Sequence, residues 1–78
     1  MVYRILLVGC GNVGSRHLQA LVKIPFSVNI DIIEPNTSSK KLGLSRLEEI
    51  SYNKKTKIIN WYNNYTSKIL NSDLVIVA

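Results

Sequence analysis

The sequence predicts an α/β fold, in which a parallel sheet is flanked by helices. Segments with strand character alternate with segments of helical periodicity in the order βαβαβαβ, which is typical of parallel strands joined by right-handed crossovers. The first and last of these strands are near-continuous apolar runs, as expected for parallel strands covered on both faces. The chain has 78 residues and therefore holds one small domain at most.

The N-terminal third supplies a strand and a helix. Tyr3–Val8 is predicted to be a central strand of the sheet. A helix should follow from about Val13 to Ile24, where Pro25 stops it. At 100° per residue its polar arc holds Ser15, Arg16, Gln19 and Lys23. Its apolar side is expected to hold Val13, Leu18, Ala20, Leu21, Val22 and Ile24.

The second strand and second helix follow. Val28–Ile33 alternates more than the first strand, with Asn29 and Asp31 on one side, so burial of that side should be incomplete. A helix is expected at about Ser39–Ile50. Its cap is Thr37, Ser38 or Ser39, and its packing stripe is Gly43, Leu44, Leu47 and Ile50. The glycine in that stripe would permit close approach to the sheet.

The remaining residues add a third and a fourth strand. Lys57–Tyr62 is predicted to be a strand, Tyr65–Asn71 a short helix, and Leu74–Ala78 another buried parallel strand. A buried strand needs cover on both faces, and nothing follows Ala78. We therefore expect residues 1–78 to be the N-terminal part of a longer polypeptide, with the sheet truncated after about four strands.

A glycine-rich turn joins the first strand to the first helix. Gly9, Gly11 and Gly14 have the GxGxxG spacing of a dinucleotide-binding fingerprint, in the strand–turn–helix context that this motif requires. Gly9 permits the tight turn, Gly11 lets a pyrophosphate approach the backbone, and Gly14 lets the helix pack on the strand. The sequence thus predicts a Rossmann-like fold, with residues 1–78 as the N-terminal part of a dinucleotide-binding domain and with the rest of that domain and the substrate domain outside these residues.

Two further features belong to the same expected site. The amides at the helix start, around Asn12 and Val13, lack intrahelical partners and can bind a phosphate at the positive end of the helix dipole. Glu34 lies 20 residues beyond Gly14, where an acidic residue can bind the ribose hydroxyls of adenosine. Its carboxylate would repel a 2′-phosphate, so NAD is favoured over NADP, although Lys40 and Lys41 soften that preference. A vestigial turn or another adenine ligand remains an alternative.

Other reactive residue types show no catalytic pattern. His17 falls within the expected apolar arc, which favours a packed, hydrogen-bonded histidine. Cys10 lies by a helix N-terminus, which can lower a thiol pKa, but no motif places a base beside it. Asp31, Glu48 and Glu49 show no metal-ligand spacing, so we expect solvated surface roles and no metal site.

Composition limits the function classes. The net charge is +5, but the basic residues are spread along the chain, and the cluster Lys54, Lys55 and Lys57 fits a solvated turn. Nucleic-acid binding is therefore not predicted. No apolar run reaches the length of a membrane span and no signal peptide is recognisable. The single cysteine, Cys10, favours a reducing compartment, and we expect a cytoplasmic protein.

Three segments together resemble the N-terminal domain of the Gfo/Idh/MocA oxidoreductases. These are the stretch Gly9–Leu18, with Arg16-His17 after the glycines, then Ile32–Pro35, and then Ser72–Ala78. The resemblance implies an NAD(P)-dependent dehydrogenase acting on a sugar, cyclitol, nucleotide-sugar or related hydroxyl compound. The matching residues are spread thinly over most of the chain. Glu34 occupies a position where aspartate is more usual in the family.

The resemblance carries over cofactor positions only. These are Gly9, Gly11, Asn12, Val13, Gly14 and Glu34. The family's catalytic lysine, typically in a Glu-Lys-Pro motif, lies beyond the fourth strand, so no catalytic residue is expected within these 78 residues. The small-molecule substrate would be bound by later regions, and the full-length protein is expected to be a homo-oligomer.

Two other functions share this half of the fold. A nucleotide-sensing regulatory Rossmann domain would bind NAD or ATP without turnover, and this chain alone does not separate it from the enzyme. A methyltransferase also has a glycine-rich turn after its first strand. It is disfavoured because GxGxxG running straight into a helix suits a pyrophosphate better.

Overall fold

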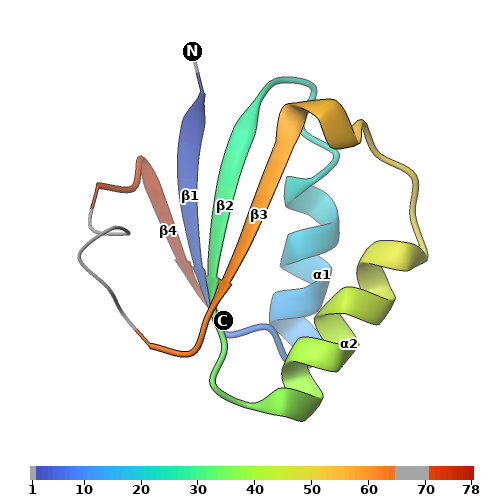
Figure 1. Ribbon diagram of the computed structural model, residues 1–78, viewed down its shortest axis with the longest axis vertical. Helices are drawn as coiled ribbons and strands as arrows, with labels where there is room; N and C mark the ends of the chain where they lie inside the picture. Colours follow the sequence, from blue (N-terminus) through green and yellow to red (C-terminus); the bar gives the residue numbers. More distant parts are fainter. Residues whose placement is uncertain (1, 65–70) are drawn as a thin grey trace.

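The computed structural model describes residues 2–64 and 71–78, and within them it contains a parallel sheet and two helices (Figure 1). The four strands have the order β3-β2-β1-β4, and every neighbouring pair is parallel. The α/β class predicted from the sequence is confirmed. The strands are β1 (Tyr3–Val8), β2 (Val28–Ile33), β3 (Lys57–Tyr62) and β4 (Leu74–Val77). The helices are α1 (Asn12–Leu21) and α2 (Thr37–Glu48), with a short 3₁₀ helix, η1 (Lys54–Thr56).

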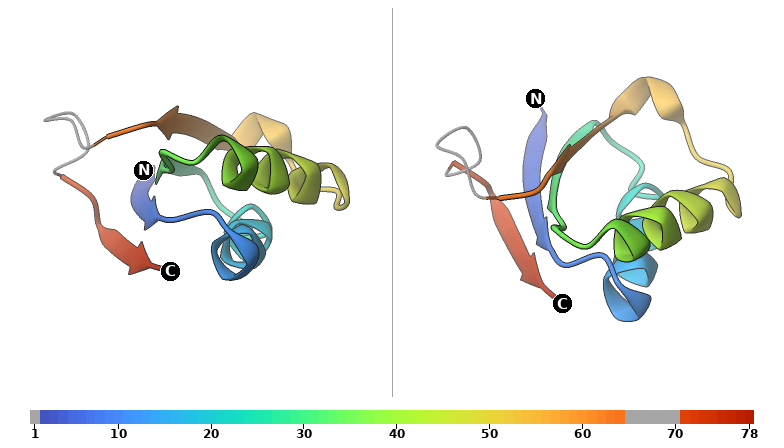
Figure 2. Two further views of the ribbon diagram at one scale, coloured as in Figure 1. Left: turned by 90° about the horizontal axis from the view of Figure 1, so that it is seen from below. Right: turned by 60° about the horizontal axis from the view of Figure 1, so that its bottom comes forward.

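The strand order determines where the helices lie. The chain moves from β1 to β2 to β3 in one direction along the sheet, and two right-handed crossovers in the same direction leave both helices on one face. Figures 1 and 2 show α1 and α2 together on that face. The chain then returns to the other side of β1, where β4 pairs with it. The strand order therefore reverses between β1 and β4.

The main core lies between the sheet and the two helices. Its buried residues come from β1, β2, α1 and α2, together with the loops that follow them. They are Ile5, Leu7, Cys10, Leu18, Leu21, Val22, Val28, Ile30, Ile32 and Leu47. The other face of the sheet has a smaller cluster of Leu6 and Ile33, with Val8 and Tyr62 packed against it. Alternate residues of β1 and β2 thus face two different clusters, as strand geometry requires.

The buried side of α1 differs from the one that the sequence predicted. Ser15 was placed in the polar arc, yet it is fully buried and its hydroxyl donates to the Asn12 carbonyl at 3.3 Å. Val13, His17 and Ala20 were placed on the apolar side, yet all three are exposed, Val13 by 61%. The close approach of Gly14 to β1 turns this part of the helix toward the sheet, so small residues face inward. The prediction of a packed His17 was wrong.

The helix ends also differ from the sequence-based expectation. α1 ends at Leu21, and Val22–Ser27 form turns instead of a last helical turn before Pro25. α2 begins at Thr37, because the side chain of Asn36 accepts from the Ser39 amide at 3.0 Å. Asn36 therefore caps the helix, in place of the expected threonine or serine. The short helix expected at Tyr65–Asn71 lies outside the described residues, apart from its last one.

Three burial predictions for the strands require correction. Asp31 was expected on a partly exposed side, but it is 1% exposed, and the Asn60 amide donates to it at 3.0 Å. β4 was expected to be buried, but Leu74, Val75 and Val77 are half or more exposed. Lys57 begins β3 as predicted, but its side chain was expected to be solvated with Lys54 and Lys55 and is only 8% exposed. No helix in the described parts of the chain is long and apolar enough to cross a membrane.

Candidate functional site

The glycine-rich turn lies at the carboxyl edge of the sheet, where the strand order reverses. It leaves β1 directly, and the Gly9 amide donates to the Ile33 carbonyl of β2 at 2.9 Å. On its other side is Ala78, which follows β4 and whose amide donates to the Val8 carbonyl at 2.9 Å. Ligands of open parallel sheets bind at this kind of position. The fold therefore puts the turn where a ligand site is expected.

Two of the three glycines are required by the fold itself. Gly9 has φ of 94°, a left-handed conformation that glycine adopts without strain. Gly14 is buried against the turn, and a Cβ on it would overlap the Gly9 carbonyl oxygen and lie 2.7 Å from the carbonyl carbon. Because those atoms belong to the backbone, a side chain at position 14 cannot be accommodated by a rotamer change. Gly9 shapes the turn and Gly14 lets α1 pack on it.

Gly11 is different, because no neighbouring atom in the described chain occupies the place of a side chain there. Its φ of −72° lies outside the left-handed region, and its ψ is −149°. A Cβ on Gly11 would meet only the Ser39 hydroxyl, at an ordinary contact distance of 3.8 Å. The backbone at Gly11 is thus left open on the side that a side chain would cover. This opening is the space through which a phosphate group can approach the main chain.

The N-terminus of α1 is uncapped by any side chain, whereas that of α2 is capped. Gly11 occupies the N-cap position of α1, and no acidic residue lies in the first turn. The first amides of a helix, here those of Asn12, Val13 and Gly14, have no acceptor within the helix. In α2 the Asn36 side chain supplies such an acceptor. An anion at Gly11 would fulfil the same role for α1.

Glu34 lies beside this turn, at the end of β2. Its Oε1 accepts from the Cys10 amide at 2.7 Å, and its Oε2 accepts from the Asn36 amide at 3.0 Å. The carboxylate thereby ties the glycine turn to the cap of α2, and the residue is 9% exposed. Each oxygen of an ionised carboxylate can accept a second hydrogen bond. Glu34 can therefore hold the turn in place and still accept from a ligand hydroxyl.

Arg46 also reaches the site, which the sequence did not indicate. Its guanidinium donates to the Asn12 side-chain oxygen at 3.0 Å and to the Asn12 carbonyl at 3.3 Å. This contact turns the Asn12 side chain toward α2 and brings a positive charge to the start of α1. Ser39 approaches the turn from α2 in the same way. Both contacts depend on how α2 crosses α1, which no local sequence pattern encodes. The Lys40 ammonium, whose charge was expected to soften the cofactor preference, instead lies 5.8 Å from the centre of the Trp61 ring.

Cys10 is not a nucleophile in this structure. Its side chain is fully buried between the sheet and α2, where a Cβ on Gly43 would lie 2.6 Å from its sulfur. Burial, and then the negative charge of Glu34, raise the pKa of the Cys10 thiol to about 11. The helix N-terminus therefore does not lower this pKa. The expected close approach of Gly43 to the sheet is confirmed, since a Cβ on Gly43 would lie 2.8 Å from the Trp61 ring of β3, whereas Leu44, expected in the same packing stripe, is 42% exposed.

Alkylation of Cys10 should accordingly be slow. The ordinary thiol pKa of 9.0 rises to about 11, so at pH 8 the thiolate fraction, and with it the rate with iodoacetamide, should fall by about a hundredfold. The rate should continue to increase with pH up to about 11. Mass spectrometry of the folded protein measures this rate, with the urea-unfolded chain as the control. Equal rates in the two states would contradict the burial of Cys10.

The other residue types tested on the sequence form no reactive cluster. His17 is exposed on α1, and Glu48 and Glu49 are exposed at the end of α2. In residues 2–64 and 71–78 no group of three or more histidine, cysteine or acidic side chains is arranged to hold a metal ion. Of the residues singled out in the sequence, the structure brings Glu34 together with the glycine turn.

Comparison with known proteins adds no assignment. No family model, no curated protein and no solved structure matched the chain.

Proposed function

We propose that this chain is the NAD-binding portion of an oxidoreductase. One observation carries the proposal. At Gly11 an open backbone coincides with the uncapped N-terminus of α1, at the edge where the strand order reverses. A pyrophosphate accounts for both features, because it needs close approach to the main chain and accepts from the free amides of a helix start.

The remaining site residues fit a dinucleotide. The amides of Asn12 and Val13 would bind the pyrophosphate, and the charge of Arg46 next to Asn12 would favour it electrostatically. Glu34 would accept from the ribose hydroxyls of adenosine. Its carboxylate already holds the glycine turn through Cys10, so the residue that selects the ribose also positions the phosphate site.

The proposed reaction is a hydride transfer. Hydride would pass between the nicotinamide and a hydroxyl-bearing substrate carbon, and the resemblance to Gfo/Idh/MocA proteins suggests a sugar, cyclitol or nucleotide sugar. Cys10 is a buried thiol and His17 an exposed side chain, and neither is next to the glycine turn's open side in a catalytic arrangement. We expect the nicotinamide half of the site to be built by later strands, so residues 1–78 by themselves should bind weakly.

Cofactor preference tests the proposal. Calorimetric titration should show that NAD binds at least about tenfold more tightly than NADP, because the Glu34 carboxylate repels a 2′-phosphate. Glu34→Gln removes the charge, and its amide nitrogen cannot accept from one of the two backbone amides that Glu34 holds, so it should erode the preference for NAD with some loss of NAD affinity. Glu48→Gln makes the same change on the exposed side of α2 and should leave the preference unaltered.

Two results would count against this function. Equal affinity of the unmutated protein for NAD and NADP would remove the role given to Glu34. Binding of NAD without reduction of NAD by any hydroxyl compound, in the full-length protein, would favour a regulatory nucleotide-binding domain over a dehydrogenase.

A further inference from the structure

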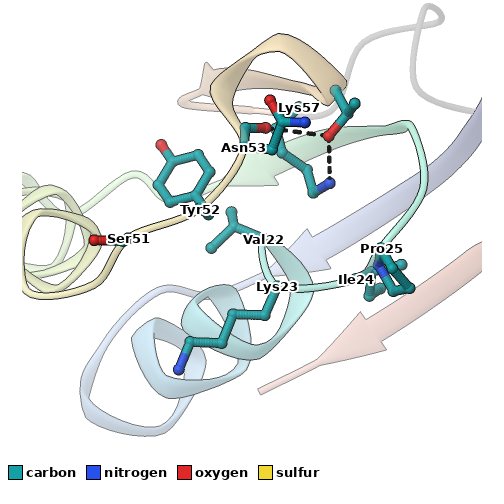
Figure 3. A pocket seen from close by; sticks show the side chains of 9 residues that line it. Val22, Lys23, Ile24, Pro25, Ser51, Tyr52, Asn53 and Lys57 are labelled. Carbon is teal, nitrogen blue, oxygen red and sulfur yellow. Dashed lines mark hydrogen bonds between the residues drawn. The ribbon is translucent and has the colours of Figure 1, made fainter.

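A separate cavity lies near the start of β3, whereas the glycine turn follows the end of β1. The two therefore lie at opposite ends of the parallel strands. The cavity has a volume of about 300 Å³ and is enclosed by the turn after α1 and by the segment that leads through η1 into β3 (Figure 3). Val22, Ile24, Pro25 and Tyr52 supply apolar surface, and Lys57 lines the cavity from the start of β3. A cavity of this volume is at the lower end of the range of small-molecule sites.

Lys57 is an unusual residue to find in such a place. It is 8% exposed, and its ammonium group donates to the Phe26 carbonyl at 2.9 Å and to the Thr56 hydroxyl at 2.8 Å. Both acceptors are neutral, and no ion pair involves Lys57 in the described part of the chain. A lysine ammonium has three N–H donors, so one remains unused. Burial of a cation without a counter-charge is costly, and a bound anion would offset that cost.

Lys57 carries the buried positive charge at this cavity. Figure 3 shows Lys57 near Asn53 on one side of the cavity, with Val22 and Pro25 on the other side. Lys23 borders the cavity, but its exposed side chain points away from Lys57 (Figure 3). None of the lining residues is acidic. A concave surface with charges of one sign concentrates counter-ions.

We propose that this cavity binds a small organic carboxylate. The carboxylate accepts from the unused N–H of Lys57, and the apolar part of the ligand packs against Val22, Ile24, Pro25 and the Tyr52 ring. An apolar body with one anionic group matches a site that has one buried ammonium and an apolar wall. The site is independent of the NAD site, because the two lie at opposite ends of the parallel strands.

Benzoate is a suitable probe, with benzamide as its neutral analogue of the same shape. In ¹⁵N-correlated NMR spectra at constant ionic strength, benzoate should cause saturable shifts of the amides of 22–24, 26–27 and 51–57. Benzamide should bind at least about tenfold more weakly, since its carbonyl oxygen can accept from Lys57 but brings no negative charge to the buried ammonium. Lys57→Met should reduce benzoate affinity by about the same factor, whereas Lys41→Met, an equal change of charge on α2, should not.

Several outcomes would overturn the proposal. These are absence of saturable shifts with benzoate, equal affinity for benzamide, and equal loss in Lys41→Met. Saturable shifts with inorganic phosphate but not with benzoate would also overturn it, because the apolar wall would then have no role. If Lys57→Met proves unfolded by circular dichroism, the comparison of benzoate with benzamide on the unmutated protein decides.

Discussion

Gly14→Ala is expected to destabilise the fold by about 3 kcal/mol or more, at the upper end of the cost of overpacking. The added Cβ would overlap the Gly9 carbonyl oxygen, and the Cβ of Ala78 would lie only 3.4 Å away. Relief of this clash requires α1 to move off the end of β1. Small domains have little stability to lose, so much of the protein should be unfolded. Urea denaturation followed by circular dichroism measures the effect.

Gly11→Ala is the matched control, three residues earlier in the same turn. Its Cβ would have only an ordinary contact with Ser39 at 3.8 Å, so the loss should stay below about 1 kcal/mol, mostly from a less favoured N-cap residue. Similar losses in the two variants would show that Gly14 does not set the packing of α1 on β1.

Gly11→Ser should separate binding from stability. Serine is a preferred N-cap residue, and its hydroxyl can accept from the Val13 or Gly14 amide, so the unfolding free energy should be unchanged or higher by a few tenths of a kcal/mol. The same hydroxyl fills the space and uses the donors that a pyrophosphate needs. Affinity for NAD should therefore fall by at least about tenfold, as measured by calorimetry.

The control for this variant is Ser39→Ala, which removes the nearest side-chain atom to Gly11 without filling the opening. It should leave NAD affinity within about threefold, because no donor or phosphate space is lost. Undiminished NAD affinity in Gly11→Ser would contradict the assignment of the open backbone to a phosphate.

The sequence was sufficient for the parts of the fold that depend on local pattern. The apolar runs located all four strands, and the GxGxxG spacing predicted both the tight turn at Gly9 and the close packing at Gly14. Glu34 was correctly placed at the end of β2 beside the turn. Each of these features is encoded within a few residues, or by the fixed length of one βαβ unit.

Features that depend on how elements pack were not predictable in this way. The periodicity of α1 put Ser15 outward and His17 inward, because a helical wheel takes no account of the rotation that Gly14 imposes. The carboxylate of Asp31 is enclosed through its cross-strand neighbour Asn60, and the contact of Arg46 with Asn12 spans two helices. Lys57 was read as part of a charged turn, since sequence shows charge but not the shape around it.

The central claim is that the open backbone at Gly11 binds the pyrophosphate of NAD, and amide NMR tests it most directly. Titration with NAD should give saturable shifts at Gly11, Asn12 and Val13, whereas adenosine, which lacks phosphate, should not shift these amides. Saturable NAD shifts confined to other parts of the chain, or equal shifts at Gly11 with NAD and adenosine, would contradict the account.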